Sequence, residues 1–212
     1  MIVSLKTFFK SAIALTIPTS LCSAPTLAAD LSELNGNWES ISCEVRPQVG
    51  QDGKVTEWWL TRKIEMKDGR IVADFTTYAG PGCDVPLQVL GFAGSVTKVG
   101  ESDVTVGAIN ADLKVDEYVR FTPIADGFAR FLNSAPAGTC GAAKWEVGTT
   151  QNVHVTGCSV IGLKPNDPTV EFEVLAVQDD KLYFGARPVD GTFITSVEKR
   201  PHALQVPLKR SN

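Results

Sequence analysis

Residues 58–78 read WWLTRKIEMKDGRIVADFTTY, which is two alternating runs separated by the turn Lys67-Asp68-Gly69. The apolar positions that alternate with other residues are Trp58, Leu60, Ile64 and Met66 before the turn and Ile71, Ala73 and Phe75 after it. Because the side chains of a β-strand point alternately to opposite faces, this spacing is typical of strands with one buried face. The stretch therefore predicts a β-hairpin.

Similar runs continue along the chain. They cover residues 41–45, 85–99, 102–108, 111–121, 170–176 and 182–184, with Gly91 and Gly94 as bulges or bends. The expected buried faces carry Ile41, Cys43 and Val45 in the first run, and Val170, Phe172, Val174 and Ala176 in 170–176. About eight strands joined by hairpin-length turns fit an antiparallel barrel or a strongly curved sheet.

One segment departs from the strand period. Thr122-Pro123 is typical of a helix start, with Thr122 as N-cap and proline in the first turn. Apolar residues then recur at helical spacing until Asn133 and Pro136, namely Ile124, Phe128, Phe131 and Leu132. We predict one short α-helix here, with its aromatic stripe packed across an end of the sheet or barrel.

The first 29 residues have the pattern of a secretory signal peptide. Two lysines precede an apolar stretch, and Leu27-Ala28-Ala29 is a small-residue cleavage site. Cys22 leaves a lipoprotein signal as an alternative, although Leu21 stands where a small residue is normal. We expect a signal peptide over 1–29, a single domain over 30–212, and a secreted or periplasmic location.

The charge of the chain excludes some partners. Its net charge is −4, and removal of the leader takes away Lys6 and Lys10 but no acidic residue. An acidic chain is poorly suited to nucleic acid or to an anionic membrane surface. No second long apolar stretch follows the leader, so we expect no transmembrane anchor in the mature chain.

Four cysteines follow the leader, which predicts disulfides in an oxidising compartment. Three connectivities are possible from the sequence. We expect Cys43–Cys83 and Cys140–Cys158, since each of these pairs flanks one contiguous half of the chain. The cysteines lack the short spacing of a zinc site, and we predict no metal.

Residues for catalysis are scarce. The two histidines, His154 and His202, stand beside no recognisable nucleophile motif, and glycine-rich phosphate loops are absent from the sequence. With all four cysteines assigned to bridges, no thiol remains as a nucleophile. We predict a protein that is not an enzyme and that uses no cofactor.

Two charged residues share strand faces with apolar ones. Arg62 lies in register with Leu60 and Ile64, and Glu117 with Val115 and Val119. A buried charge must be paired or must line a wet cavity, unless strand twist brings it to the rim. Two interpretations stay open: strand twist lets each side chain reach the rim, or, as a hypothesis, Arg62 marks the polar end of an apolar pocket where a carboxylate or head group docks. The candidate ligand-binding residues are Trp58, Leu60, Arg62, Phe75, Glu117 and Phe172.

Glu44 and Arg46 are neighbours on one face of the first strand. We expect them to join a structural ion-pair network that anchors this strand to the C-terminal residues. The charged residues available there are Arg187, Asp190, Glu198 and Arg200.

Two phrases near the ends of the chain carry a family resemblance. The first is Leu34-Asn35-Gly36-Asn37-Trp38 with Cys43-Glu44-Val45-Arg46-Pro47, and the second is Phe184-Gly185-Ala186-Arg187-Pro188 with Lys199-Arg200-Pro201. Together they resemble the extracellular repeat of the adenomatosis polyposis coli down-regulated family, the animal Wnt-inhibitor membrane proteins. The resemblance covers Leu34 to about Arg210, essentially one copy of the repeat. It implies the same cysteine pairing, and Thr61-Arg62 matches a Leu-Thr-Arg phrase of the family.

The motif Leu-x-Gly-x-Trp38 is also similar to a lipocalin motif, in which such a tryptophan closes the base of a barrel. The downstream cysteine and Arg-Pro spacing favours the Wnt-inhibitor-type domain. Both resemblances imply a mainly β fold: an antiparallel β-barrel or strongly curved sheet, lipocalin-like in outline, with one short α-helix.

The sequence leaves alternative functions open. The resemblance implies a non-enzymatic module that shelters a lipid or other hydrophobic ligand in a barrel cavity. The alternative is a protein-interaction or structural module with a dry core and no small ligand. An eight-stranded barrel permits both, because its interior is just wide enough to be filled by side chains or to hold one small ligand. An enzyme on the same scaffold would need polar groups that the sequence does not show.

Overall fold

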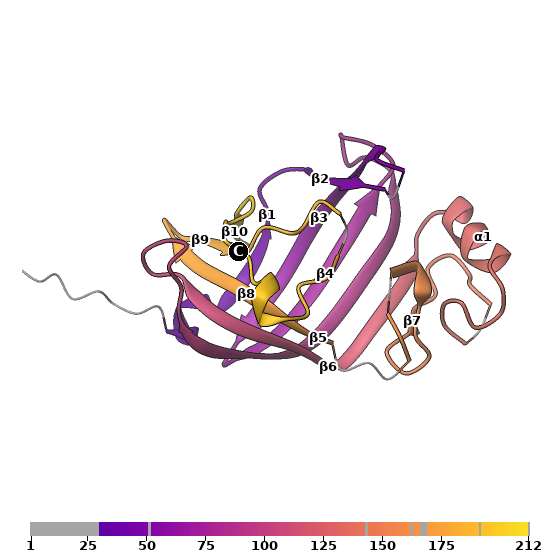
Figure 1. The fold of residues 1–212 in the computed structure, drawn as a ribbon. Helices are drawn as coiled ribbons and strands as arrows, with labels where there is room; N and C mark the ends of the chain where they lie inside the picture. The colour runs from indigo at the N-terminus through magenta and orange to yellow at the C-terminus, as the bar shows by residue number, and fades with distance from the viewer. Residues whose placement is uncertain are drawn as a thin grey trace, which may run out of the picture.

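The computed structural model describes residues 30–211 except 51, 143, 162, 166–168 and 191. The expected signal peptide lies outside these residues. The described part is mainly β, with one antiparallel sheet of ten strands that curves into a ring and one α-helix (Figure 1). This confirms the predicted fold class. Within the described ranges, no helix is long and apolar enough to cross a membrane.

The strands are β1 (Gly36–Ser40), β2 (Glu44–Val49), β3 (Val55–Lys67), β4 (Arg70–Tyr78), β5 (Pro86–Glu101), β6 (Ile109–Pro123), β7 (Gln151–Asn152), β8 (Thr169–Gln178), β9 (Lys181–Phe184) and β10 (Leu208–Arg210). The helix is α1 (Asp126–Ser134), and the 3₁₀ turns are η1 (Leu31–Leu34), η2 (Ser159–Ile161) and η3 (Val197–Lys199). The 58–78 hairpin is confirmed as β3–β4. The expected strand over 102–108 is wrong, since these residues connect β5 to β6.

The ring closes through β1. Around it the strands follow the order β1-β10-β9-β8-β6-β5-β4-β3, and β1 then pairs with β3. β3 is long enough to pair twice along the same edge: Lys63–Met66 pair with β1, and Val55–Leu60 pair with β2. Because β1 pairs with β10 on one side and with β3 on the other, the sheet has no free edge at β1.

Trp38 of β1 belongs to the buried core and lies against the 3₁₀ turn η1. Its indole is buried, and its Nε1 donates a hydrogen bond to Leu34 O at 2.8 Å. The Arg210 guanidinium covers the ring at 4.1 Å from the centroid. Gly36 has φ +143°, and a Cβ there would lie 2.3 Å from Arg210 Nη1, so this position favours glycine. Leu34, Gly36 and Trp38 of the Leu-x-Gly-x-Trp motif are thus brought together with Arg210.

Side chains fill the half of the ring next to Trp38. The buried residues of this core include Ile64, Met66, Ile71, Leu113, Leu175, Leu182 and Leu208. Each lies on a strand position that faces inward, and their burial is the main favourable term for closing the ring.

The other half of the ring is less complete. β6 pairs with β8 only over Ile109–Val115, while its later residues Arg120 and Phe121 pair with β7. A bulge in β5–β6 accompanies the change, between Ala93 and Gly94. Gly94 is required there, because an added Cβ would lie 1.9 Å from Lys114 O. The bulge expected at Gly94 is therefore confirmed.

The segment between β6 and β8, called the insertion here (residues 124–142, 144–161 and 163–165), lies beside this second half (Figure 1). Phe121 of β6 packs against Phe128 and Trp145 of the insertion, with both ring centroids 5.8 Å away. The Cys140–Cys158 disulfide ties the insertion together, and Cys43–Cys83 ties the start of β2 to the β4–β5 connection. Both predicted pairings are confirmed, and two disulfides fit an oxidising compartment.

The helix differs from its prediction at its start. Thr122 and Pro123 remain in β6, where Pro123 pairs with Gln88, and α1 begins at Asp126 after the extended Ala125. Leu132 is buried, but Phe131 is exposed, so the expected aromatic stripe is only partly correct. The strand pairing of β5 with β6 outweighs the local helix-start signal, as tertiary context often does.

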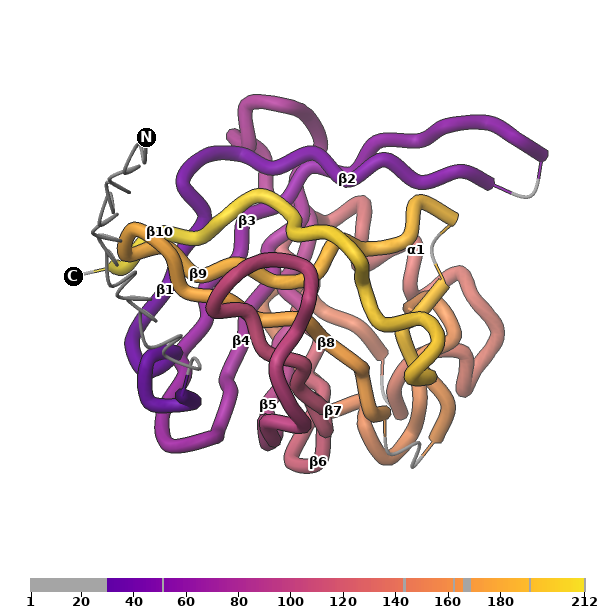
Figure 2. Tube along the Cα trace, turned by 60° about the vertical axis from the view of Figure 1, so that its left-hand side comes forward, coloured from indigo at the N-terminus to yellow at the C-terminus, as the bar shows by residue number. Residues whose placement is uncertain are grey.

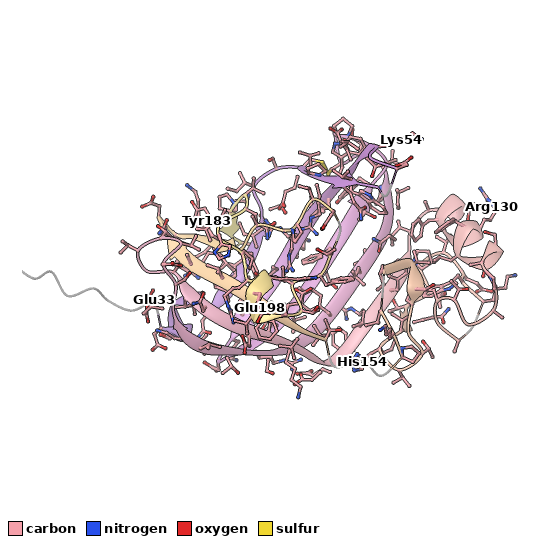
Figure 3. The ribbon with its side chains drawn as sticks, viewed as in Figure 1. Glu33, Lys54, Arg130, His154, Tyr183 and Glu198 are labelled. Atoms are coloured by element: carbon pink, nitrogen blue, oxygen red, sulfur yellow. A yellow bond between two sulfur atoms is a disulfide. The ribbon has the colours of Figure 1, made fainter. Side chains whose placement is uncertain are left out.

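The segment after β9, called the C-terminal segment (residues 185–190 and 192–207), crosses the ring before β10 (Figure 2). Its backbone bonds hold it against three strands: Val49 N donates to Val189 O, Phe172 N to Ile194 O, and Gln205 N to Phe184 O. The β2–β3 hairpin projects beyond the body in Figure 2, and Lys54 marks its tip in Figure 3.

Candidate ligand-binding face inside the ring

The strand register shows which side chains face the inside of the second half. Residues opposite one another on neighbouring strands point to the same face. One inward row runs across β2 to β5 as Glu44, Leu60, Thr77 and Gln88. The next row, closer to Trp38, runs across β3 to β6 as Arg62, Phe75, Leu90 and Phe121. Trp58 pairs with Arg46 at the rim beyond both rows.

Four of the six predicted ligand-binding residues share this inner face: Trp58, Leu60, Arg62 and Phe75. Glu117 and Phe172 do not. They were assigned to the pocket by strand alternation, and in each case the strand is not oriented as the pattern suggests.

Glu117 lies in the β5–β6 bulge. Ala93 pairs with Tyr118 and Gly94 with Val115, so the alternation is interrupted between these residues. Glu117 is exposed and forms an ion pair with Arg70. The expectation that it faces the pocket with Val115 and Val119 is therefore wrong.

Phe172 lies on the outer face of β8. Its partner on β6 is Asp112, whose carboxylate accepts a hydrogen bond from Arg200 at 2.8 Å, and the Arg200 guanidinium lies 5.4 Å from the Phe172 centroid. The C-terminal segment covers this side, so the apolar alternation of β8 packs outside the ring. Glu171 and Glu173 face inward instead, opposite Leu113 and Ala111.

The faces of β2 are also exchanged relative to the prediction. Val45 is 56% exposed, whereas Glu44 is buried and Arg46 is half-buried on the inner side. Glu44 pairs with Arg62, with Oε1 2.9 Å from Nε, so the expected pairing of Glu44 with the C-terminal residues is wrong. It is Arg62 that reaches the C-terminal segment, donating from Nη2 to Val206 O at 2.8 Å.

An apolar wall lines part of the inner face. Phe75, Leu90 and Phe92 pack against the core yet are only partly buried, and Phe75 and Phe92 meet edge to face with centroids 5.5 Å apart. Trp58 at the rim is 45% exposed. Solvent therefore reaches inward-facing aromatic and aliphatic side chains in this half, in contrast to the filled half next to Trp38.

A cluster of six charged residues lies beside this wall: Glu44, Arg46, Arg62, Glu171, Glu173 and Arg187. Arg62 is only 2% exposed and pairs with Glu44. Arg187, from the C-terminal segment, contacts Glu171 at 2.9 Å and also pairs with Glu173. Buried charges need such partners, because desolvation of an isolated ion costs several kcal/mol. We call this set the charged cluster.

The charged cluster shifts the pKa of its members. Burial raises the pKa of Glu173 to about 7, although Arg187 favours the carboxylate. Burial lowers the pKa of Arg46 to about 10, and the positive charges of Arg187 and Arg62 lower it further. For Arg187, the attraction of Glu173 and Glu171 outweighs burial, so the pKa is raised.

Three buried oxygens on this face have no hydrogen-bond partner among the described residues: Thr77 Oγ1, Gln88 Oε1 and Glu173 Oε2. Thr77 and Gln88 are cross-strand neighbours, so two of these atoms come from adjacent positions. Buried polar atoms are nearly always satisfied by protein, water or ligand. This face can therefore accept hydrogen bonds from a bound molecule beside the apolar wall.

Sequence reasoning did not select Thr77, Gln88, Glu171 or Glu173 as site residues. Thr77 and Gln88 carry no motif, and only the register of the folded sheet brings them together. Glu171 and Glu173 alternate with apolar residues, which suggested the opposite orientation of the strand.

Two surface hollows stand out in the described part of the chain, and both lie outside this face. One is lined by the insertion between Leu132 and Trp145, and the other by Glu65, Lys67, Asp68, Arg70 and Val72 on β3–β4. The described residues bring together no group of three or more His, Cys, Asp or Glu suited to a metal ion. Neither of these two hollows lies inside the ring.

No family model matches this chain.

Proposed function

We propose that the protein is a non-enzymatic binding module of the periplasm or the extracellular space that holds a small ligand with an apolar body. The ligand occupies the half of the ring away from Trp38. Its apolar part packs on Phe75, Leu90 and Phe92, and Trp58 lies at the entrance.

The observation that carries this proposal is the partial exposure of the inner wall. Aromatic and aliphatic side chains that face the inside of a closed sheet are normally buried by the sheet itself. Phe75, Leu90 and Phe92 are packed on the core but keep exposed surface. Burying it under a ligand is favourable by about 25 cal/mol per Å². Thr77 and Gln88 offer acceptors at the edge of the same surface.

Because the half next to Trp38 is filled, the ligand does not run the length of the ring. A short or compact hydrophobic molecule fits this arrangement better than a long acyl chain. The resemblance to the Wnt-inhibitor-type domain supports the same class of function, and we propose membership of that family together with it.

A protein-interaction role is a second candidate. The projecting β2–β3 hairpin exposes Val45, Val55 and Trp58, and the neighbouring C-terminal segment exposes Val189 and Phe193. Exposed apolar side chains gathered in one region are typical of interaction sites. A partner that inserts an apolar side chain against the inner wall would combine both roles.

Uptake of the neutral fluorophore N-phenyl-1-naphthylamine tests the proposal. We expect saturable binding that a Leu90→Trp variant weakens at least about tenfold, because the larger ring occupies the wall. Val99→Trp is the matched control, since Val99 lies on the same strand and is exposed. Circular dichroism and thermal melting report whether each variant folds. Equal binding by both folded variants, or no saturable uptake by the unsubstituted protein, contradicts the proposal.

A further inference from the structure

The charged cluster is unevenly paired. Glu44 binds Arg62, and Glu171 and Glu173 both bind Arg187. Arg46 is the arginine of the cluster without a partner: among the residues that the structure describes, none forms a hydrogen bond or an ion pair with its guanidinium. Arg46 is nevertheless half-buried and lies on the inner side of β2.

The surroundings of Arg46 make this arrangement unfavourable without a further partner. The charges that act on it come from β2, β3, β8 and the C-terminal segment: Glu44, Arg62, Glu171 and Arg187. Two of these are positive, and the two acids are already bound to other arginines. A half-buried cation with no partner is destabilising, and stability is commonly reduced at residues kept for function.

Glu173 gives a second indication that an anion binds within the ring. Its side chain is fully buried, and its Oε2 has no partner among the described atoms. With its pKa raised to about 7, Glu173 is partly protonated at neutral pH, which leaves the cluster short of negative charge. An anion bound within the ring would supply that charge, and a protonated Glu173 could donate a hydrogen bond to it.

We propose that Arg46 receives an anionic oxygen group of the ligand, so that the protein prefers amphipathic anions over neutral molecules of the same length. This rests on the proposed function and names the ligand class. A guanidinium presents paired donors that match both carboxylate and phosphate oxygens. We assign this role to Arg46 and not to Arg62, because the charge of Arg62 is already paired with Glu44 and its Nη2 already donates to Val206 O. The apolar part of the anion lies toward Phe75 and Leu90, which are two and three strands away from Arg46.

The geometry also predicts how Arg46 differs from a structural arginine. Removing Arg62 strips Glu44 of its cation, whereas removing Arg46 breaks no ion pair within the described part of the chain. An Arg46→Met variant should therefore be as stable as the unsubstituted protein, or more stable, while losing its preference for anions.

Isothermal titration calorimetry at neutral pH with octanoate, octyl phosphate and octanol tests the inference. A charge-assisted contact predicts that octanoate or octyl phosphate binds at least about tenfold more tightly than octanol. The anion that binds more tightly shows whether Arg46 prefers a carboxylate or a phosphate group. Arg46→Met should bring the anion down to the affinity of octanol, and Arg46→Lys should restore part of the difference. Arg130→Met is the matched control, since Arg130 lies exposed on α1, away from the ring (Figure 3).

The outcomes separate the two proposals. Equal affinities for the anions and octanol, or an Arg46→Met variant that keeps the preference, overturns the role of Arg46 and leaves the proposed function standing. A folded protein that binds neither the octyl compounds nor the naphthylamine probe overturns both.

Discussion

Glu173→Gln should make the stability of the protein less dependent on pH. Glu173 is 0% exposed on the inner face of β8, with the guanidinium of Arg187 beside it and Glu171 two residues away. Glutamine keeps the size of the side chain and cannot ionise. Arg187 also contacts Glu171 at 2.9 Å, so it keeps an acidic partner when Glu173 is replaced, and the main change is the loss of one titrating group.

The size and sign follow from the pKa. Burial raises the pKa of Glu173 from 4.5 to about 7. At about 1.36 kcal/mol per pKa unit, this corresponds to about 3 kcal/mol. Between these pH values the folded state keeps a proton that the unfolded state has lost, so the free energy of unfolding falls as pH rises. The contribution of Glu173 is fully present below pH 4.5 and is lost as pH passes about 7.

Urea unfolding followed by tryptophan fluorescence at pH 4.5 and pH 8 measures this effect. Relative to the unsubstituted protein, Glu173→Gln should gain about 3 kcal/mol of unfolding free energy between the two pH values. Glu65→Gln, on the exposed side of β3, controls for the loss of one negative charge. If the free-energy difference between Glu173→Gln and the unsubstituted protein is the same at both pH values, Glu173 does not titrate as its burial requires.

Two further predictions concern stability. Arg62→Met should destabilise the fold by about 3–5 kcal/mol, because it leaves the Glu44 carboxylate buried without its cation. In urea unfolding, the Arg62→Met/Glu44→Met double variant should recover most of this loss. A double variant as unstable as Arg62→Met would show that the pair does not act as a unit. Gly94→Ala should cost about 1–3 kcal/mol, because its Cβ would press on the backbone oxygen of Lys114. Gly100→Ala, where an added Cβ meets no described atom within 4 Å, should change the melting temperature little, and equal effects at the two glycines would argue against the observed bulge.

The sequence predicted the parts of the fold that depend on local pattern. The 58–78 hairpin has both a strict alternation and a turn, and it folds as β3–β4. The four cysteines pair as expected. Gly36 and Trp38 of the Leu-x-Gly-x-Trp motif both lie against Arg210, whose guanidinium covers the indole.

Where both faces of a strand are covered, the alternation of apolar and polar residues does not show which face points into the ring. In β8 the apolar face with Phe172 is buried by the C-terminal segment, so Glu171 and Glu173 turn inward. Their partner Arg187 comes from that same segment, and no local pattern relates the three residues. In β2 the inward Glu44 depends in the same way on Arg62 of β3.

The candidate site was predictable only in part for the same reason. Trp58, Leu60, Arg62 and Phe75 belong to one regular hairpin, so they share a face as expected. Glu117 was misplaced because a bulge shifts the register of β6. Arg46 was expected in a structural ion pair, and its lack of one among the described residues emerges only when the charges of β3, β8 and the C-terminal segment are placed around it.

The location of a bound molecule tests the account most directly. Isotope-edited NMR of the full chain with octanoate can detect contacts between the methylene protons of the ligand and protein side chains. We expect contacts from these protons to the rings of Phe75 and Phe92 and to the methyl groups of Leu90. Contacts confined to the outside of the sheet, or to the hollow of the insertion near Trp145, would contradict it.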